Sequence, residues 1–173
     1  VKSAIIAIER MGFTKSILRS KNAVIPIAYY YSKVKDKTYD AKDEQQMMLY
    51  LHSVLILGFY GTHGDTALAD IRKAMVKNAD SELGPFELRD IHKKGFNFKD
   101  IANQYTKEVS EGKIKKELII ARKEQITDLL KTSYGSKSFI ILACMNKELI
   151  KDNDKNRRKN KSGAKVHQDH LYP

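Results

Sequence analysis

Several residue types are scarce in this chain of 173 residues, and each shortage excludes or disfavours a class of structure. Tryptophan is absent, and proline occurs only at positions 26, 85 and 173, so most of the chain is free of helix-breaking residues. The one cysteine, Cys144, excludes a disulfide within the chain and points to a reducing, cytoplasmic environment. No apolar run approaches the roughly twenty residues that span a bilayer, and no signal peptide is visible, so we expect no membrane segment.

Acidic residues are fewer than basic residues, and this difference indicates which kind of binding partner the chain favours. The chain has 32 Lys and Arg against 21 Asp and Glu, a net charge of +11 that favours polyanions such as nucleic acid. The stretch from Lys151 to Lys165 supplies +5 of that total and has no apolar side chain before Ala164. We interpret it as a flexible basic linker. Its candidate DNA-binding residues are Arg157, Arg158, Lys159 and Lys161.

Apolar residues recur mainly at helical spacing, which predicts a mainly α fold, an irregular multi-helix bundle over residues 1–150. The length suits one domain with a sizeable core. We expect seven helices, over residues 4–11, 22–31, 40–60, 65–78, 86–92, 124–130 and 139–150. We expect Asn22 to cap the second helix and Asp65 or Thr66 to cap the fourth. Gly12 is expected to end the first helix and Gly95 to close the fifth. Residues 96–120 show no clear boundaries.

The triplet Tyr29-Tyr30-Tyr31 has two interpretations: a stacking surface for bases, or half-buried residues of one helix. We favour the second. The sequence has no glycine-rich phosphate loop and no serine or cysteine nucleophile arrangement, so we assign no nucleotide-binding residue.

The last seven residues, His167-Gln168-Asp169-His170-Leu171-Tyr172-Pro173, resemble the opening of an HNH, or ββα-metal, nuclease motif. A divalent ion such as Mg²⁺ prefers a hard oxygen ligand, and a neighbouring neutral imidazole can accept a proton from water near neutral pH. The resemblance makes Asp169 a metal ligand, His170 the general base and His167 a supporting metal ligand. The alternative is a solvated tail in which the Asp-His pair is a coincidence.

The motif is incomplete within these residues, because such a site needs further ligands, usually an Asn or His on a helix downstream of Pro173. We therefore expect the chain to be a piece of a longer protein, in agreement with Val1 at its start. We expect it to be inactive by itself and to hold no tightly bound metal.

Four segments, in order, resemble bacterial modification-dependent, type IV restriction endonucleases of the GmrSD kind. They are residues 12–30, 58–68, 129–139 and 167–173, which include Arg19-Ser20-Lys21-Asn22, Gly61-Thr62-His63-Gly64-Asp65 and Ser133-Tyr134-Gly135-Ser136. The resemblance implies a parent with a ParB-like nucleotide-dependent domain, a helical middle region and an HNH domain. This chain then divides into a helical domain (1–150), a basic linker (151–166) and a truncated start of the HNH motif (167–173).

Two hypotheses follow. The first is a helical scaffold fragment of a DNA endonuclease in bacterial defence, with DNA, the ParB-like domain and the remaining HNH domain as partners. The second is a non-catalytic helical module that binds nucleic acid or a protein partner.

Overall fold

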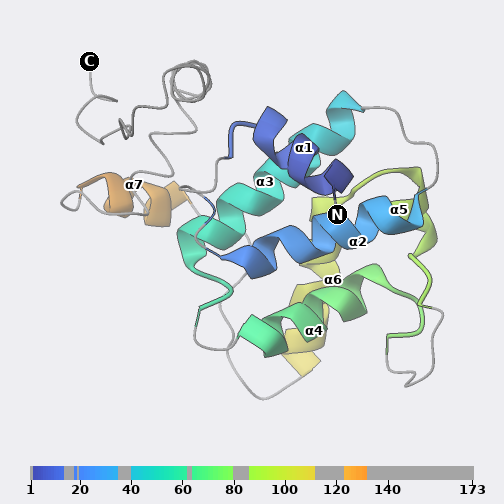
Figure 1. Ribbon diagram of the computed structural model, residues 1–173. Helices are drawn as coiled ribbons and strands as arrows, with labels where there is room; N and C mark the ends of the chain where they lie inside the picture. The colour runs from blue at the N-terminus through green and yellow to red at the C-terminus, as the bar shows by residue number, and fades with distance from the viewer. Residues whose placement is uncertain are drawn as a thin grey trace, which may run out of the picture.

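The part of the chain that the structure describes is mainly α-helical, as the sequence predicts. The computed structural model describes residues 2–13, 18, 20–34, 40–61, 64–79, 86–111 and 123–131 (Figure 1). Its elements are α1 (Lys2–Arg10), the 3-10 helix η1 (Lys21–Val24), α2 (Ile25–Lys33), α3 (Ala41–Leu57), α4 (Gly64–Met75), α5 (Asp90–Lys94), α6 (Phe98–Glu111) and α7 (Lys123–Lys131). No sheet is present in these residues, where Val76 and Leu88 form an isolated antiparallel bridge.

One hydrophobic core joins α1, η1, α2, α3, α4 and α6. Helix α4 packs against α6, α1 against α2, and α3 against both α6 and η1. The large side chains at the centre are fully buried: Tyr30, Tyr50, Phe96, Ile8, Ile27, Met47, Leu51, Ile71, Met75 and Ile101. Helix α7 contributes Ile126 and Leu129 to the edge of this core and lies on the opposite side of the molecule from α5 (Figure 1). None of the described helices is long and apolar enough to cross a membrane.

The first and third helices end where glycine permits a left-handed turn. Helix α1 ends at Arg10, and Gly12, two residues later, has a φ of 90° and turns the chain away, as expected. Asp40 caps the start of α3, where its side chain accepts a hydrogen bond from the Lys42 N–H, and Gly58, with a φ of 64°, caps the end of the helix. The sequence predicts an end at Gly61 or slightly before it. The helix ends earlier because Gly58 adopts the left-handed conformation that closes a helix at little steric cost.

The predicted caps of α2 and α4 are wrong. Asn22 lies inside η1, and α2 begins at Ile25 with no side-chain cap, although Pro26 does sit in its first turn. Helix α4 begins at Gly64, so Asp65 lies in the first turn, where an acid still favours the helix dipole. Helix α4 also ends at Met75 rather than near Asn78.

The expected helix over 86–92 is replaced by an extended segment and the short α5. The Lys77 N–H donates to the Glu87 carbonyl and the Arg89 N–H donates to the Met75 carbonyl, each at 2.9 Å. These two bonds hold the segment from Phe86 to Arg89 extended, since backbone pairing with a distant segment overrides local propensity. Gly95 follows α5, as expected.

Helix α6 begins within the region where the sequence shows no clear boundary, and α7 matches the expected helix to within one residue at each end. The Asn97 side-chain oxygen accepts a hydrogen bond from the Asp100 N–H at 2.9 Å, which satisfies one free donor of the first turn of α6. The expected helix over 139–150, the linker over 151–166 and the motif over 167–173 lie outside the described residues.

A buried carboxylate connects three elements of the core. Asp43, in the first turn of α3, is 6% exposed. Its Oδ2 accepts a hydrogen bond from the Tyr30 hydroxyl of α2, and its Oδ1 accepts from the Phe96 N–H, in the turn before α6, at 3.0 Å. Burial, and then the hydrogen bond to this carboxylate, raises the pKa of Tyr30. The hydroxyl therefore stays protonated and remains a donor.

The Tyr30→Phe substitution should lower the free energy of unfolding by about 2 kcal/mol, because it removes a donor to a buried carboxylate. Urea denaturation followed by circular dichroism measures this. The matched control is Tyr29→Phe, whose hydroxyl donates to the Phe86 carbonyl at a partly buried position. Removing that hydroxyl should cost about 1 kcal/mol or less. Equal destabilisation of the two variants would show that the hydrogen bond to Asp43 contributes no more to stability than the hydrogen bond to the Phe86 carbonyl.

Candidate functional site

All site residues predicted from the sequence lie beyond the described part of the chain. They are Asp169, His170 and His167 of the nuclease-like motif and Arg157, Arg158, Lys159 and Lys161 of the basic stretch. The structure therefore neither brings these residues together nor separates them.

Metal-ligating side chains do not gather in the described helices. Among these residues, no group of three or more His, Cys, Asp or Glu side chains is placed to hold a metal ion.

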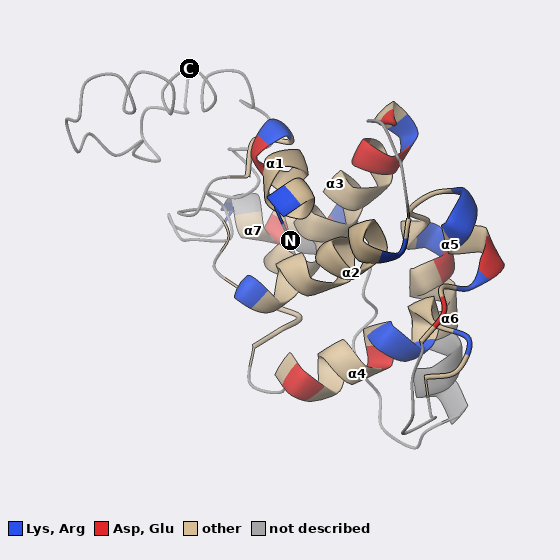
Figure 2. Ribbon diagram, turned by 45° about the vertical axis from the view of Figure 1, so that its right-hand side comes forward, with Lys and Arg blue, Asp and Glu red and all other residues tan. Residues whose placement is uncertain are grey.

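Charge is nearly balanced over the residues that the structure describes. They hold fifteen Lys and Arg against thirteen Asp and Glu, so most of the net +11 belongs to the remaining residues. Figure 2 shows basic and acidic segments interspersed over α1, α3, α4 and α5. Since opposite charges this close partly cancel at a distance, the described residues by themselves contribute little to the long-range attraction for a polyanion.

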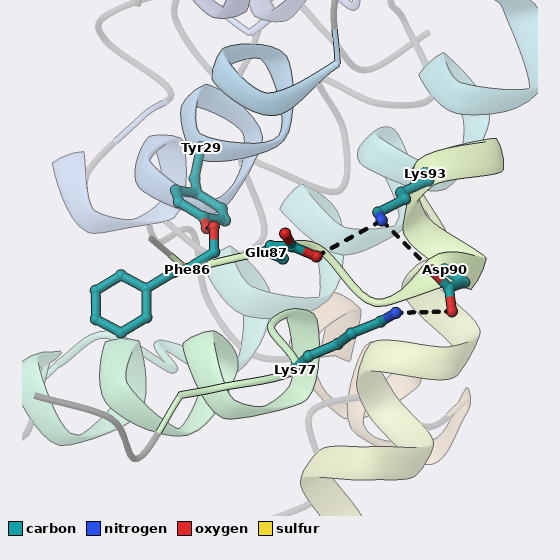
Figure 3. Close-up of polar contacts among 6 residues, drawn as sticks. All are labelled: Tyr29, Lys77, Phe86, Glu87, Asp90 and Lys93. Atoms are coloured by element: carbon teal, nitrogen blue, oxygen red, sulfur yellow. Dashed lines mark hydrogen bonds and ion pairs between the residues drawn. The ribbon is translucent and has the colours of Figure 1, made fainter. Parts of the chain in front are cut away.

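A cluster of exposed charges covers the junction of α4 and α5 (Figure 3). Lys77 Nζ lies 2.8 Å from Asp90 Oδ2, and Lys93 Nζ lies 3.5 Å from Asp90 Oδ1 and 3.8 Å from Glu87 Oε2. The hydrogen bond from Lys77 lowers the pKa of Asp90. All four side chains are well exposed, so solvent screens these pairs and they add little stability.

The tyrosine triplet belongs to the core, which agrees with the second of its two interpretations. Tyr30 is fully buried, and Tyr29 and Tyr31 are partly buried and pack against the core. The Tyr29 hydroxyl donates to the Phe86 carbonyl at 2.9 Å, as Figure 3 shows. The Arg72 guanidinium covers the Phe86 ring at 5.2 Å from its centroid. These rings already have partners, so they offer no open stacking platform for bases.

A second tyrosine pair is structural as well. The Tyr50 and Tyr60 hydroxyls lie 2.7 Å apart, and the two side chains are 0% and 7% exposed. Burial raises the pKa of both. Both hydroxyls stay neutral and satisfy each other inside the core, where an unpaired hydroxyl would be costly.

The most unusual polar group in the described part is His92 of α5. It is 0% exposed, and neither ring nitrogen has a hydrogen bond of good geometry. Asp100 Oδ2 of α6 lies 3.5 Å from its Nε2, and the backbone of Ala74 in α4 faces the ring. Burial lowers the pKa of His92 against the opposing effect of Asp100 and of the Ala74 backbone, and the nearby Arg89 lowers it further.

This geometry does not make His92 a catalytic base. A general base must reach the proton that it takes from a substrate or water, and the ring of His92 is shut off from solvent. Its position is therefore that of a buried structural group whose protonation state matters to the packing around it.

Neither Asp43 nor His92 stands out in the sequence. An acid in the first turn of a helix is ordinary, so no local pattern marks Asp43 as buried. His92 lies near a turn without a partner at ligand spacing in the sequence, and Asp100 belongs to the next helix, α6.

Comparison of the chain with protein-family models, with curated proteins and with solved structures finds no match.

Proposed function

We propose that the chain is the helical scaffold of a cytoplasmic DNA endonuclease that acts in bacterial defence against foreign DNA, including modified DNA. The observation that carries the proposal is the seven-residue segment His167 to Pro173, which follows a basic stretch and three further segments that resemble the GmrSD kind of endonuclease. The mainly α fold of the described residues is compatible with a helical middle region.

In the complete protein, the terminal motif would carry the chemistry. Asp169 and His167 are the proposed ligands of a divalent cation such as Mg²⁺, together with residues beyond Pro173. When bound, the cation supplies charge stabilisation to the departing oxygen of the phosphodiester. His170 takes the proton from the attacking water, a task suited to an imidazole that is neutral near pH 7.

The helical part has a different proposed task. One core joins α1, α2, α3, α4 and α6, and the residues that the structure describes hold nearly equal numbers of basic and acidic side chains. We assign to it the positioning of the neighbouring domains, namely the ParB-like nucleotide-dependent domain and the rest of the HNH domain. Contact with DNA phosphates is assigned to Arg157, Arg158, Lys159 and Lys161.

In the longer parent protein, with a complete motif, His170→Ala should lower metal-dependent DNA cleavage by about 100-fold or more, because general-base catalysis is removed. DNA binding should be unchanged. Asp169→Asn should require more Mg²⁺ for the same cleavage rate. Cleavage is followed on gels across a Mg²⁺ titration, and undiminished cleavage by the His170 variant would refute the assignment.

Salt dependence tests where the chain contacts DNA. Replacing Arg157, Arg158 and Lys159 by Gln should reduce the slope of log affinity against log salt by about 0.9 for each phosphate that the protein no longer neutralises. The matched control replaces Lys77, Lys93 and Lys94 by Gln, which also removes three positive charges but from the charge-balanced helical part. The control slope should equal that of the wild type, as measured by fluorescence anisotropy with a labelled duplex.

The net charge of +11 also favours the second candidate, a non-catalytic module that binds nucleic acid. The two candidates separate in these experiments. DNA binding with a normal salt slope, but no cleavage by the parent protein under any metal, would support the module. If the chain fails to bind DNA even at low salt, a scaffold or protein-docking role remains. The assignment of DNA contact to the four basic residues would then be wrong.

A further inference from the structure

Helix α5 is docked onto the molecule by one buried side chain. Of its five residues, His92 is the buried one. Asp90, Lys93 and Lys94 are exposed, and Ile91 is 42% exposed. The exposed charge pairs that join α5 to Lys77 and Glu87 add little, so the contact of the imidazole with α4 and α6 dominates the docking.

The surroundings of His92 suit a neutral ring better than a charged one. A buried imidazolium needs strong hydrogen bonds or an opposite charge to replace its lost water. Asp100 on α6 supplies one carboxylate, 3.5 Å from Nε2. The positive charge of Arg89 opposes protonation of the ring, and its Nη2 donates to the Lys73 carbonyl at 3.1 Å. From α4, the backbone of Ala74 favours the protonated ring, as Asp100 does, but burial outweighs both and lowers the pKa of His92.

The structure also limits how far a disturbance at His92 would spread. Before α5, the Arg89 N–H donates to the Met75 carbonyl at 2.9 Å. After α5, the Phe96 N–H donates to Asp43, and the Phe96 ring packs edge-on against Tyr30 and Tyr50. Residues 90–95 between these two fixed points can therefore separate from the core without unfolding the rest.

We propose that His92 is a proton-sensitive contact: its neutral ring holds α5 against α4 and α6, and its protonation releases residues 90–95 to solvent. This would give the protein a local response to mild acid that is independent of the endonuclease proposal. Release would carry Lys93 and Lys94 away from the balanced surface of the α4–α5 junction and uncover the side of α6 near Asp100.

The direction in pH follows from the lowered pKa of His92. The ordinary value is 6.5, and the ring of the docked state takes up its proton only at lower pH. Docking is therefore fully present above the ordinary pKa and is lost as the pH falls below it. At a pH about one unit below the ordinary pKa, uptake of one proton by the open state raises the population of that state by at most about tenfold.

Hydrogen exchange with mass spectrometry tests this on the intact chain at about pH 7.5 and about pH 5.5, with labelling times scaled to the intrinsic exchange rates. After that correction, opening of the peptide that covers α5 should rise by up to about tenfold at the lower pH. Opening of α3 should not change. An equal increase in α3 would mean global acid unfolding and would overturn the proposal.

Two further measurements keep the test independent of a single variant. His92→Gln, whose side chain is neutral at both pH values, should abolish the pH dependence of α5 opening. His52→Gln, which alters a histidine of α3 packed against Phe13, should retain it. In the wild type, the NMR signal of the His92 ring should titrate below its ordinary pKa. Titration at or above that value, or a persistent acid response in His92→Gln, would contradict the proposed role.

Discussion

The carboxylate of Asp43 ties the described fold together. It receives hydrogen bonds from α2 through Tyr30 and from the turn before α6 through Phe96, while belonging itself to α3. Two consecutive helices and a turn 53 residues beyond Asp43 thus meet at one buried carboxylate. A buried carboxylate is tolerated only when donors replace its water, so removal of either donor takes away part of that compensation. This requirement fixes the relative positions of the three segments more specifically than apolar contact alone.

Segments next to each other in the described part of the molecule are held by different interactions. Phe96 is fixed by Asp43, whereas α5 just before it is held mainly by a neutral imidazole. Positive charge is also unevenly divided, since the described helices are nearly neutral and the excess lies in the rest of the chain.

Much of the helical pattern follows from local sequence. The start of α3 at Asp40, the turn at Gly12 and the span of α7 all rest on capping and periodicity within a few residues. The expected helix over 86–92 failed because Phe86 to Arg89 pairs with Met75 and Lys77, a partner that no local pattern reveals. The expected cap at Asn22 failed because a 3-10 turn precedes α2. The predicted nuclease residues, Asp169 and His170 among them, rest on the motif in the sequence alone.

Composition and near neighbours along the chain are enough to set the mainly α class, the approximate limits of most helices and the net charge. Folding of the whole domain was needed to bury Asp43 as a shared acceptor and to turn His92 toward Asp100 inside the protein. Both arrangements depend on contacts between segments that chain reversal brings together. Burial and the pKa of a side chain are properties of that assembled environment, and the residue type alone does not set them.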